Sequence, residues 1–195
     1  VVLFNRSQDL QSLSSVTSDN LQGGRKVAEF LLASAPNRIG YIAGWEGAST
    51  QRDREFGFRQ RLAEAGRDID LRMIGNFHMD SARQATLEMF DRKAPPDAIF
   101  VANDHMAFAV MDTLRFELGV SVPHDVSVVG YDDVPTAAWP AYDLTTVRQP
   151  VNQMVTRTVE TLLRQIDDPG STPSRVALDG PLIIRRSARL PEGWT

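Results

Sequence analysis

The chain has 195 residues and contains no cysteine. This absence excludes disulfide bonds, thiolate zinc sites and a cysteine nucleophile. Long apolar runs are missing as well: a run such as residues 107–111 falls far short of the ~20 residues that a bilayer-spanning helix requires. The first residues show no basic segment followed by an apolar one, so no secretory signal is visible. We therefore expect a protein without a membrane association and with a cytoplasmic location.

Clustered basic charge is also absent. The chain carries 21 Lys and Arg against 25 Asp and Glu, a net charge of −4, and its arginines are spread along the sequence. A nucleic-acid-binding surface requires clustered Lys and Arg, so this chain is not expected to bind DNA by itself. Its 42% apolar and 24% charged residues are ordinary for a globular protein and exclude intrinsic disorder.

The sequence lacks the common catalytic motifs. It has no phosphate-binding G-x-x-x-x-G-K-[ST] loop, no G-x-G-x-x-G, no G-x-S-x-G and no H-E-x-x-H. His78, His105 and His124 have no metal-ligand spacing, so no metal and no cofactor are expected. Asp132 and Asp133 leave one minor alternative, a magnesium-dependent phosphoacceptor enzyme, although further acidic ligands are not evident. The prediction is a protein that is not an enzyme.

Short apolar runs alternate with segments of helical periodicity. The runs at 38–44, 71–75, 97–102 and 126–130 have strand length, and an amphipathic segment separates each from the next. Such repetition predicts right-handed βαβ units and a doubly wound parallel α/β sheet. A further amphipathic stripe runs through 151–166, and 175–188 resembles a strand pair interrupted at Gly180. The apolar start at 1–4 reads as a buried strand without a lead-in, which indicates a fragment.

Polar side chains of four different kinds follow the predicted strands. Arg54 lies in the helix after the first core strand, Phe77 follows the second, Asn103 the third and Asp132 the fourth. Ligands of open parallel sheets bind beyond the carboxyl ends of the strands, so these side chains should share one edge. A guanidinium, a ring, an amide and a carboxylate together recognise hydroxyl groups and apolar ring faces.

Each of these residues also has a purely structural interpretation. Asp104 and Asp133 are typical of helix N-caps or first-turn acids, and Asn103 is a frequent cap as well. Arg54 would be a solvated helix residue, and periodicity alone favours a core position for Phe77. Both interpretations remain open at the level of the residues.

Several segments of the sequence are similar to sequence motifs of one protein family. They are the Asp19-Asn20 and Gly23-Gly24 region, RIGYIAG at 38–44, REFGF at 54–58, PDAIFVAND at 96–104, VPHDVSVVGYDD at 122–133 and LTTVRQP at 144–150. Together, in order and over essentially the whole chain, they resemble the lactose/galactose-repressor family of bacterial transcription regulators.

The resemblance implies a type I periplasmic-binding-protein-like fold, in which two α/β lobes close on a small effector. It assigns residues 1–17 and 148–172 to a partial N-terminal lobe. Residues 18–147 and 173–195 would form a complete C-terminal lobe. A helix-turn-helix head and the first half of the N-terminal lobe would lie outside this chain.

The resemblance also implies roles for individual side chains. Arg54 would grip ligand oxygens, Phe77 would stack on the ligand, and Asn103 and Asp132 would bind hydroxyl or amide groups. Gln149 would reach the cleft from a hinge crossing, and Trp139 would lie near the cleft rim. The six predicted effector-binding residues are thus Arg54, Phe77, Asn103, Asp132, Trp139 and Gln149.

Two hypotheses of function follow. The first is the effector-sensing and dimerisation domain of a repressor that binds a sugar-like molecule, forms a homodimer and contacts operator DNA through the absent head. The alternative is a periplasmic sugar-binding protein that serves a transporter and shares the fold. The segments LTTVRQP and GYDD favour the regulator.

Overall fold

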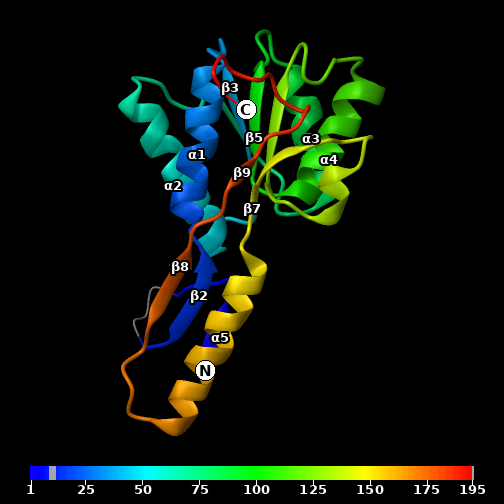
Figure 1. Cartoon of the computed structure of the whole chain (residues 1–195). Helices are drawn as coiled ribbons and strands as arrows, with labels where there is room; N and C mark the ends of the chain where they lie inside the picture. The colour runs from blue at the N-terminus through cyan, green and yellow to red at the C-terminus, as the bar shows by residue number, and fades with distance from the viewer. Residues whose placement is uncertain (9–11, 195) are drawn as a thin grey trace.

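The computed structural model describes residues 1–8 and 12–194, which form two lobes of unequal size (Figure 1). The smaller lobe contains a parallel three-stranded sheet in the order β1-β2-β8. Helix α5 packs on this sheet through buried Met154 and Thr161. The bounds of these elements are Val2–Phe4 for β1, Ser14–Ser18 for β2, Arg175–Leu178 for β8 and Val151–Asp167 for α5.

The larger lobe contains a six-stranded sheet in the order β4-β3-β5-β6-β7-β9. Its strands are parallel except β9, which runs antiparallel to β7. The strands are β3 (Ile39–Ala43), β4 (Leu71–Ile74), β5 (Ala98–Val101), β6 (Ser127–Asp132), β7 (Thr145–Arg148) and β9 (Leu182–Ile183). Strands β3 and β5 are buried along their whole length, as their continuous apolar runs predict.

Helices cover both faces of the larger sheet (Figure 1). Helices α1 and α2 lie on one face, and α3 and α4 lie on the other. This arrangement confirms the predicted doubly wound α/β class. The helices are α1 (Asn20–Ala33), α2 (Ser49–Glu64), α3 (Met79–Phe90) and α4 (Asp104–Asp112), with a π-helical turn η1 (Thr113–Glu117) and a 3₁₀ turn η2 (Pro135–Ala138). No helix in the described residues is long and apolar enough to cross a membrane.

The strand order reverses direction at β3. The chain passes from β3 to β4 on one side and then returns to β5 on the other side of β3. The crossover helices leave a crevice at such a switch point, and this crevice opens at the carboxyl ends of the strands. The fold therefore defines where a ligand can enter before any side chain is considered.

Three chain crossings join the lobes, between β2 and α1, between β7 and α5, and between β8 and β9. Strand β8 pairs with β2 in the smaller sheet, with Val16 opposite Val176. The family resemblance assigns residues 173–195 to the C-terminal lobe, whereas the structure places β8 in the sheet of the smaller lobe. The two strands predicted within 175–188 are present, but they belong to different sheets because the chain passes from one lobe to the other at Gly180. A Cβ on Gly180 would lie 1.9 Å from the carbonyl oxygen of Arg148, so the two crossings run in direct contact.

Helices α1 and α2 approach each other very closely at two glycines. A Cβ on Gly57 would lie 2.0 Å from the Leu21 carbonyl oxygen, and one on Gly24 would lie 2.1 Å from the Arg54 carbonyl oxygen. Only hydrogen fits at either position. This close packing fixes the position of α2, and hence the backbone from which the Arg54 side chain extends.

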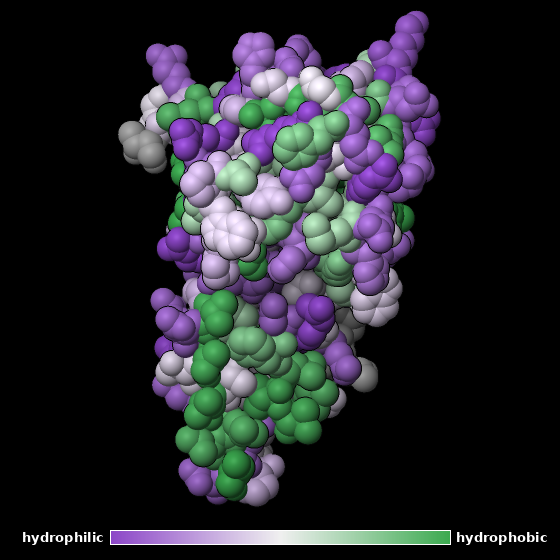
Figure 2. Space-filling model, turned by 90° about the vertical axis from the view of Figure 1, so that its right-hand side faces the viewer, coloured by the Kyte–Doolittle hydropathy of each residue, from purple (hydrophilic) through white to green (hydrophobic). Residues whose placement is uncertain are grey.

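The apolar stripe of α5 faces outward. Met154 is buried against the small sheet, but the other apolar residues of the helix are exposed. In Figure 2 apolar side chains gather over the smaller lobe. The exposed residues of this stripe are Val151, Val155, Val159, Leu162, Leu163 and Ile166.

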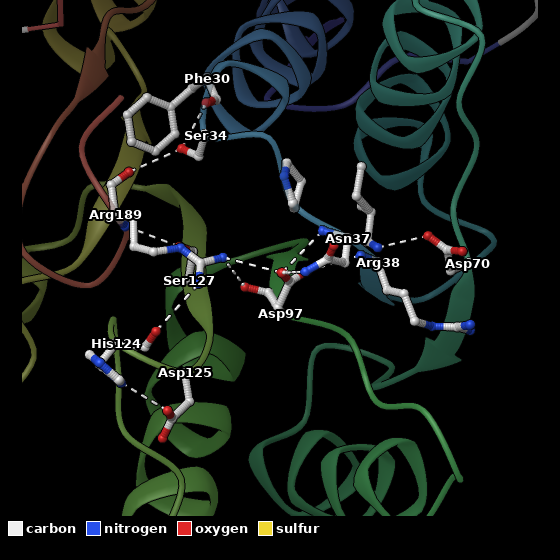
Figure 3. Close-up of polar contacts among 12 residues, drawn as sticks. Phe30, Ser34, Asn37, Arg38, Asp70, Asp97, His124, Asp125, Ser127 and Arg189 are labelled. Atoms are coloured by element: carbon white, nitrogen blue, oxygen red, sulfur yellow. Dashed lines mark hydrogen bonds and ion pairs between the residues drawn. The ribbon is translucent and has the colours of Figure 1, made fainter. Parts of the chain in front are cut away.

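The amino ends of the large sheet's strands are tied together by Asp97 (Figure 3). Its carboxylate accepts hydrogen bonds from the backbone N–H groups of Asn37 (3.0 Å) and Arg38 (2.9 Å), just before β3. Arg189 donates to the Asp97 carbonyl oxygen at 2.8 Å and so anchors the C-terminal segment. Burial raises the pKa of Asp97, but the backbone bonds outweigh it and hold the pKa below its usual value.

Candidate functional site

A cavity of about 250 Å³ lies at the carboxyl ends of the strands, where the two lobes meet. Five of the six predicted site residues line it, and they come from five separate segments of the chain. Residues directly after the end of β1 and in the first turn of α2 complete the wall. The lining residues are Asn5, Arg6, Thr50, Arg54, Phe77, Asn103, Asp132 and Gln149.

Arg54 is the most buried of the charged residues that line the cavity, with 2% of its surface exposed. Its guanidinium donates to Asn20 Oδ1 (2.8 Å), to the Ala102 carbonyl oxygen (2.6 Å) and to Asp132 Oδ1 (3.3 Å). It also lies 3.7 Å from the centre of the Tyr131 ring, a cation–π contact. Three of its five N–H groups are used in these bonds, which leaves two for another acceptor. The solvated-helix interpretation of Arg54 is therefore wrong.

Asp132 lies in an unusual backbone turn at the end of β6. Asp132 and Asp133 both have positive φ, 125° and 55°, a backbone conformation that residues other than glycine rarely adopt. Asp132 Oδ1 accepts from Arg54 and from the Gln149 amide (2.6 Å). Burial raises the pKa of Asp132, and the Arg54 charge opposes this rise. The turn directs a carboxylate, 20% exposed, towards the cavity.

Asn103 satisfies both of its proposed roles at once. Its Oδ1 accepts from the Met106 N–H at 3.1 Å, which makes it the N-cap of α4, and the residue also lines the cavity. The cap uses only the oxygen, so the amide N–H₂ remains available as a donor. The capping and cleft-lining interpretations are thus compatible.

Asp104, next to Asn103, is fully buried and stabilises the turn at Asp132 through bonds to the segments beside it. Its carboxylate accepts from the Thr146 hydroxyl (2.6 Å) and from the Val134 N–H (3.0 Å). Burial, together with the nearby charges of Asp132 and Asp133, raises the pKa of Asp104 to about 7, although the hydrogen bonds from Thr146 and Val134 oppose the rise. Its position in the first turn of α4 agrees with the structural interpretation.

Phe77 presents its ring from a second strained turn. Asn76 and Phe77 have φ of 54° and 62°, after the end of β4. The ring lies against Gly44, where an added Cβ would approach it to 2.2 Å. Phe77 is half-buried: it packs on the core with one side and lines the cavity with the other. An apolar ring face can stack there.

Two side-chain oxygens in the wall have no hydrogen-bond donor within the described residues. They are Oδ1 of Asn5 and Oε1 of Gln149, and both atoms are buried. A buried acceptor without a donor is costly, so a ligand that brings O–H or N–H groups would be favoured there.

The sequence reasoning missed Asn5, Arg6 and Thr50. Asn5 follows β1 directly, so the rule that located the other residues applied to it as well. This strand is only three residues long, and no amphipathic helical segment follows it directly as one follows the core strands of the larger lobe. The sequence pattern therefore did not mark its carboxyl end as part of a site. Thr50 lies in the first turn of α2, one residue after Ser49.

Trp139 does not line this cavity. It lies after η2 with 58% of its surface exposed, in a segment that Tyr142 ties to α4 through a 3.1 Å bond to Asp112. Of the six predicted residues, Trp139 is the one that the structure does not bring to the others.

Asp133 points away from the cavity into two arginines. Arg148 (2.5 Å) and Arg185 (2.7 Å) each donate to one of its carboxylate oxygens, so neither oxygen is free to bind a cation. In the described parts of the chain, no group of three or more His, Asp or Glu residues is placed to hold a metal ion. The magnesium alternative therefore has no donor set in the described structure.

A doubly wound lobe, three crossings and a polar cavity between two lobes define a two-lobed α/β protein with a cavity at the junction of its lobes. The family model described as "Periplasmic binding protein-like domain" matches residues 28–188, and the chain belongs to this family. Its relatives are transcription regulators, which confirms the resemblance to the lactose/galactose-repressor family.

Three relatives illustrate the match. The regulator CelR of Thermobifida fusca is 35% identical over 179 residues, which are 91% of this chain and 52% of CelR. The repressor PurR of Photobacterium profundum is 33% identical over 180 residues, 91% of this chain and 54% of PurR. A solved CelR–cellobiose complex superposes with a TM-score of 0.89 at 34% identity, covering 95% of this chain and 58% of that one. The chain thus spans about half the length of the curated relatives it matches.

Proposed function

We propose that this chain is the effector-binding part of a bacterial transcription regulator of the lactose/galactose-repressor family. The whole protein would act in the cytoplasm as a homodimer and bind operator DNA through a helix-turn-helix head. A small sugar-like effector would bind between the lobes. By contacting one lobe arrangement better than another, it would shift the population and so change the spacing of the two heads.

The observation that carries the proposal is the convergence of Arg54, Phe77, Asn103, Asp132 and Gln149 on one cavity at the lobe crossings. These groups can donate to, accept from and stack on a hydroxylated ring. Asp132 accepts hydrogen bonds from both Arg54 and Gln149, and a ligand held here would touch residues of both lobes. The cellobiose complex of CelR supports a sugar-like ligand.

The alternative, a periplasmic sugar-binding protein, shares the fold and the cavity. The matched relatives named as regulators favour the proposal. The two functions differ in one observable: only a regulator releases or gains DNA affinity when the ligand binds.

The test uses the full-length protein in two assays. Calorimetric titration against a panel of sugars and related metabolites identifies the effector, and fluorescence anisotropy with labelled upstream DNA then measures how that effector changes DNA affinity. We expect a change of 5–150-fold, the usual range of allosteric coupling. Ligand binding without any effect on DNA would support the periplasmic alternative instead.

Two variants test the site. Asp132→Asn keeps the size of the side chain and should weaken the effector at least tenfold, because a charge-assisted hydrogen bond is lost. Arg54→Ala should abolish measurable binding. Arg61→Ala, on the same helix but in its last turn, is the control and should bind as the unmodified protein does. Unchanged affinity in both Asp132→Asn and Arg54→Ala would refute the site.

A further inference from the structure

Arg6 brings a positive charge into the cavity that no carboxylate neutralises within the described residues. Its guanidinium donates only to the Asn5 carbonyl oxygen (3.0 Å) and to the Thr50 hydroxyl (3.3 Å). Arg54, in contrast, is paired with Asp132 in the same wall. The lining of the cavity therefore has one positive charge in excess, and it comes from the smaller lobe.

The surroundings of Arg6 add to this positive character. Arg6 contacts Thr50 in the first turn of α2, and the next residue, Ser7, donates its N–H to Ser49 Oγ at 3.0 Å. Helix α2 has 16 residues, no side-chain cap at Ala48 and no acidic residue in its first turn. Within the described residues, the positive end of the α2 dipole near Arg6 is therefore offset neither by a side-chain cap nor by a first-turn acid.

Other atoms of the wall require donors instead. Asn5 Oδ1 and Gln149 Oε1 are buried acceptors without a partner in the described chain, and Asp132 is a further acceptor. An anion offers only acceptors, so it cannot satisfy these oxygens. The cavity accordingly calls for a ligand that carries both hydroxyl groups and an anionic group.

We propose that the effector is a small polyol with an anionic group, a carboxylate or a phosphate. The anion would lie against the Arg6 guanidinium where it meets the first turn of α2, and the hydroxyls would bond to Asn5, Asp132 and Gln149. The volume of about 250 Å³ is below the roughly 300–1,000 Å³ common for ligand pockets, which fits one sugar ring. This inference rests on the proposed function and names the class of molecule that the same site accepts.

The experiment is a calorimetric titration of the full-length protein with two matched sets. One set is D-glucose, D-glucuronate and D-glucose 6-phosphate, and the other is the corresponding D-galactose series. We expect an anionic member to bind roughly 10–100-fold more tightly than its neutral sugar, as a charge-assisted bond provides. The uronate and phosphate arms show which anion is recognised. Equal affinity of the neutral and anionic members would overturn the inference while leaving the proposed function intact.

Two variants of equal charge loss locate the effect. Arg6→Gln should remove most of the roughly 10–100-fold difference in affinity between the anionic member and its neutral sugar. Arg61→Gln, in the last turn of α2, should leave both affinities unchanged. If Arg6→Gln weakened neutral and anionic members equally, Arg6 would not be the anion contact and the inference would be overturned. If no member of either set bound, the proposed sugar-like effector and this inference would both be overturned.

Discussion

The buried carboxyl of Asp104 makes a specific prediction about pH. Its pKa lies at about 7 in the folded protein, against an ordinary value of 3.8. Between these two pH values the unfolded chain releases the proton while the folded protein keeps it. The folded state therefore binds more protons, and the free energy of unfolding falls as pH rises through this window. A difference of roughly three pKa units corresponds to about 4 kcal/mol, reached once the pH exceeds the folded pKa.

The substitution Asp104→Asn removes this ionisation while keeping the shape of the side chain. Its oxygen can still accept from the Val134 N–H, and its amide can donate to the Thr146 hydroxyl, which then acts as acceptor. At pH 4.5 we expect the variant to be within about 1 kcal/mol of the unmodified protein. At pH 8 the variant should be the more stable of the two, by up to about 4 kcal/mol.

Urea unfolding at five pH values from 4.5 to 8.5 measures this difference, since contributions of all other groups cancel between the two proteins. Asp167→Asn, an exposed carboxylate at the end of α5, is the matched control for the loss of an acid. A stability difference between Asp104→Asn and the unmodified protein that stays constant across this pH range would refute the reasoning.

Three further predictions concern packing, strand ends and surface. Gly57→Ala should lower the free energy of unfolding by about 1–3 kcal/mol in urea titrations, because its Cβ would lie 2.0 Å from the Leu21 carbonyl oxygen. Asp97→Asn should cost about 1.5–3 kcal/mol at pH 7. Its folded pKa is lowered, so this difference should shrink as pH falls from the ordinary value of 3.8 through the lower pKa of the folded state. Val159→Glu with Leu163→Lys should reduce binding of an apolar dye to the 195-residue chain without lowering its unfolding midpoint, since these side chains are 49% and 55% exposed.

Much of the larger lobe could be predicted because its pattern is local. Each core strand is a short apolar run, and each ends in a polar residue whose role follows from the geometry of parallel sheets. That rule brought Arg54, Asn103 and Asp132 together without any knowledge of the intervening chain. The positive φ at Phe77 and Asp132 could not be predicted, because the surrounding tertiary contacts impose it.

The smaller lobe was less predictable because its pairings are non-local. Nothing in the alternation of residues 175–178 distinguishes a strand of one sheet from a strand of the other. Its membership follows from pairing with β2, far away in the sequence. The position of Asn5 and Arg6 in the cavity wall was not predicted for the same reason, because the role of a three-residue strand depends on the elements that pack beside it. Whether the apolar stripe of α5 faces the protein core or the solvent also depends on the elements packed around the helix, which the periodicity of its sequence does not reveal.

The late position of β8 has a consequence for how the protein is made. Ser18 of β2 pairs with Leu178, a residue that leaves the ribosome 160 positions later. Strands β3 to β7 emerge during that interval, so five of the six strands of the large sheet can pair on the nascent chain before β8 is present to complete the small sheet. The two halves of the cavity are therefore brought into register only after β8 has been synthesised, and a polypeptide that ended before β8 would lack one strand of each sheet, β8 of the small one and β9 of the large one.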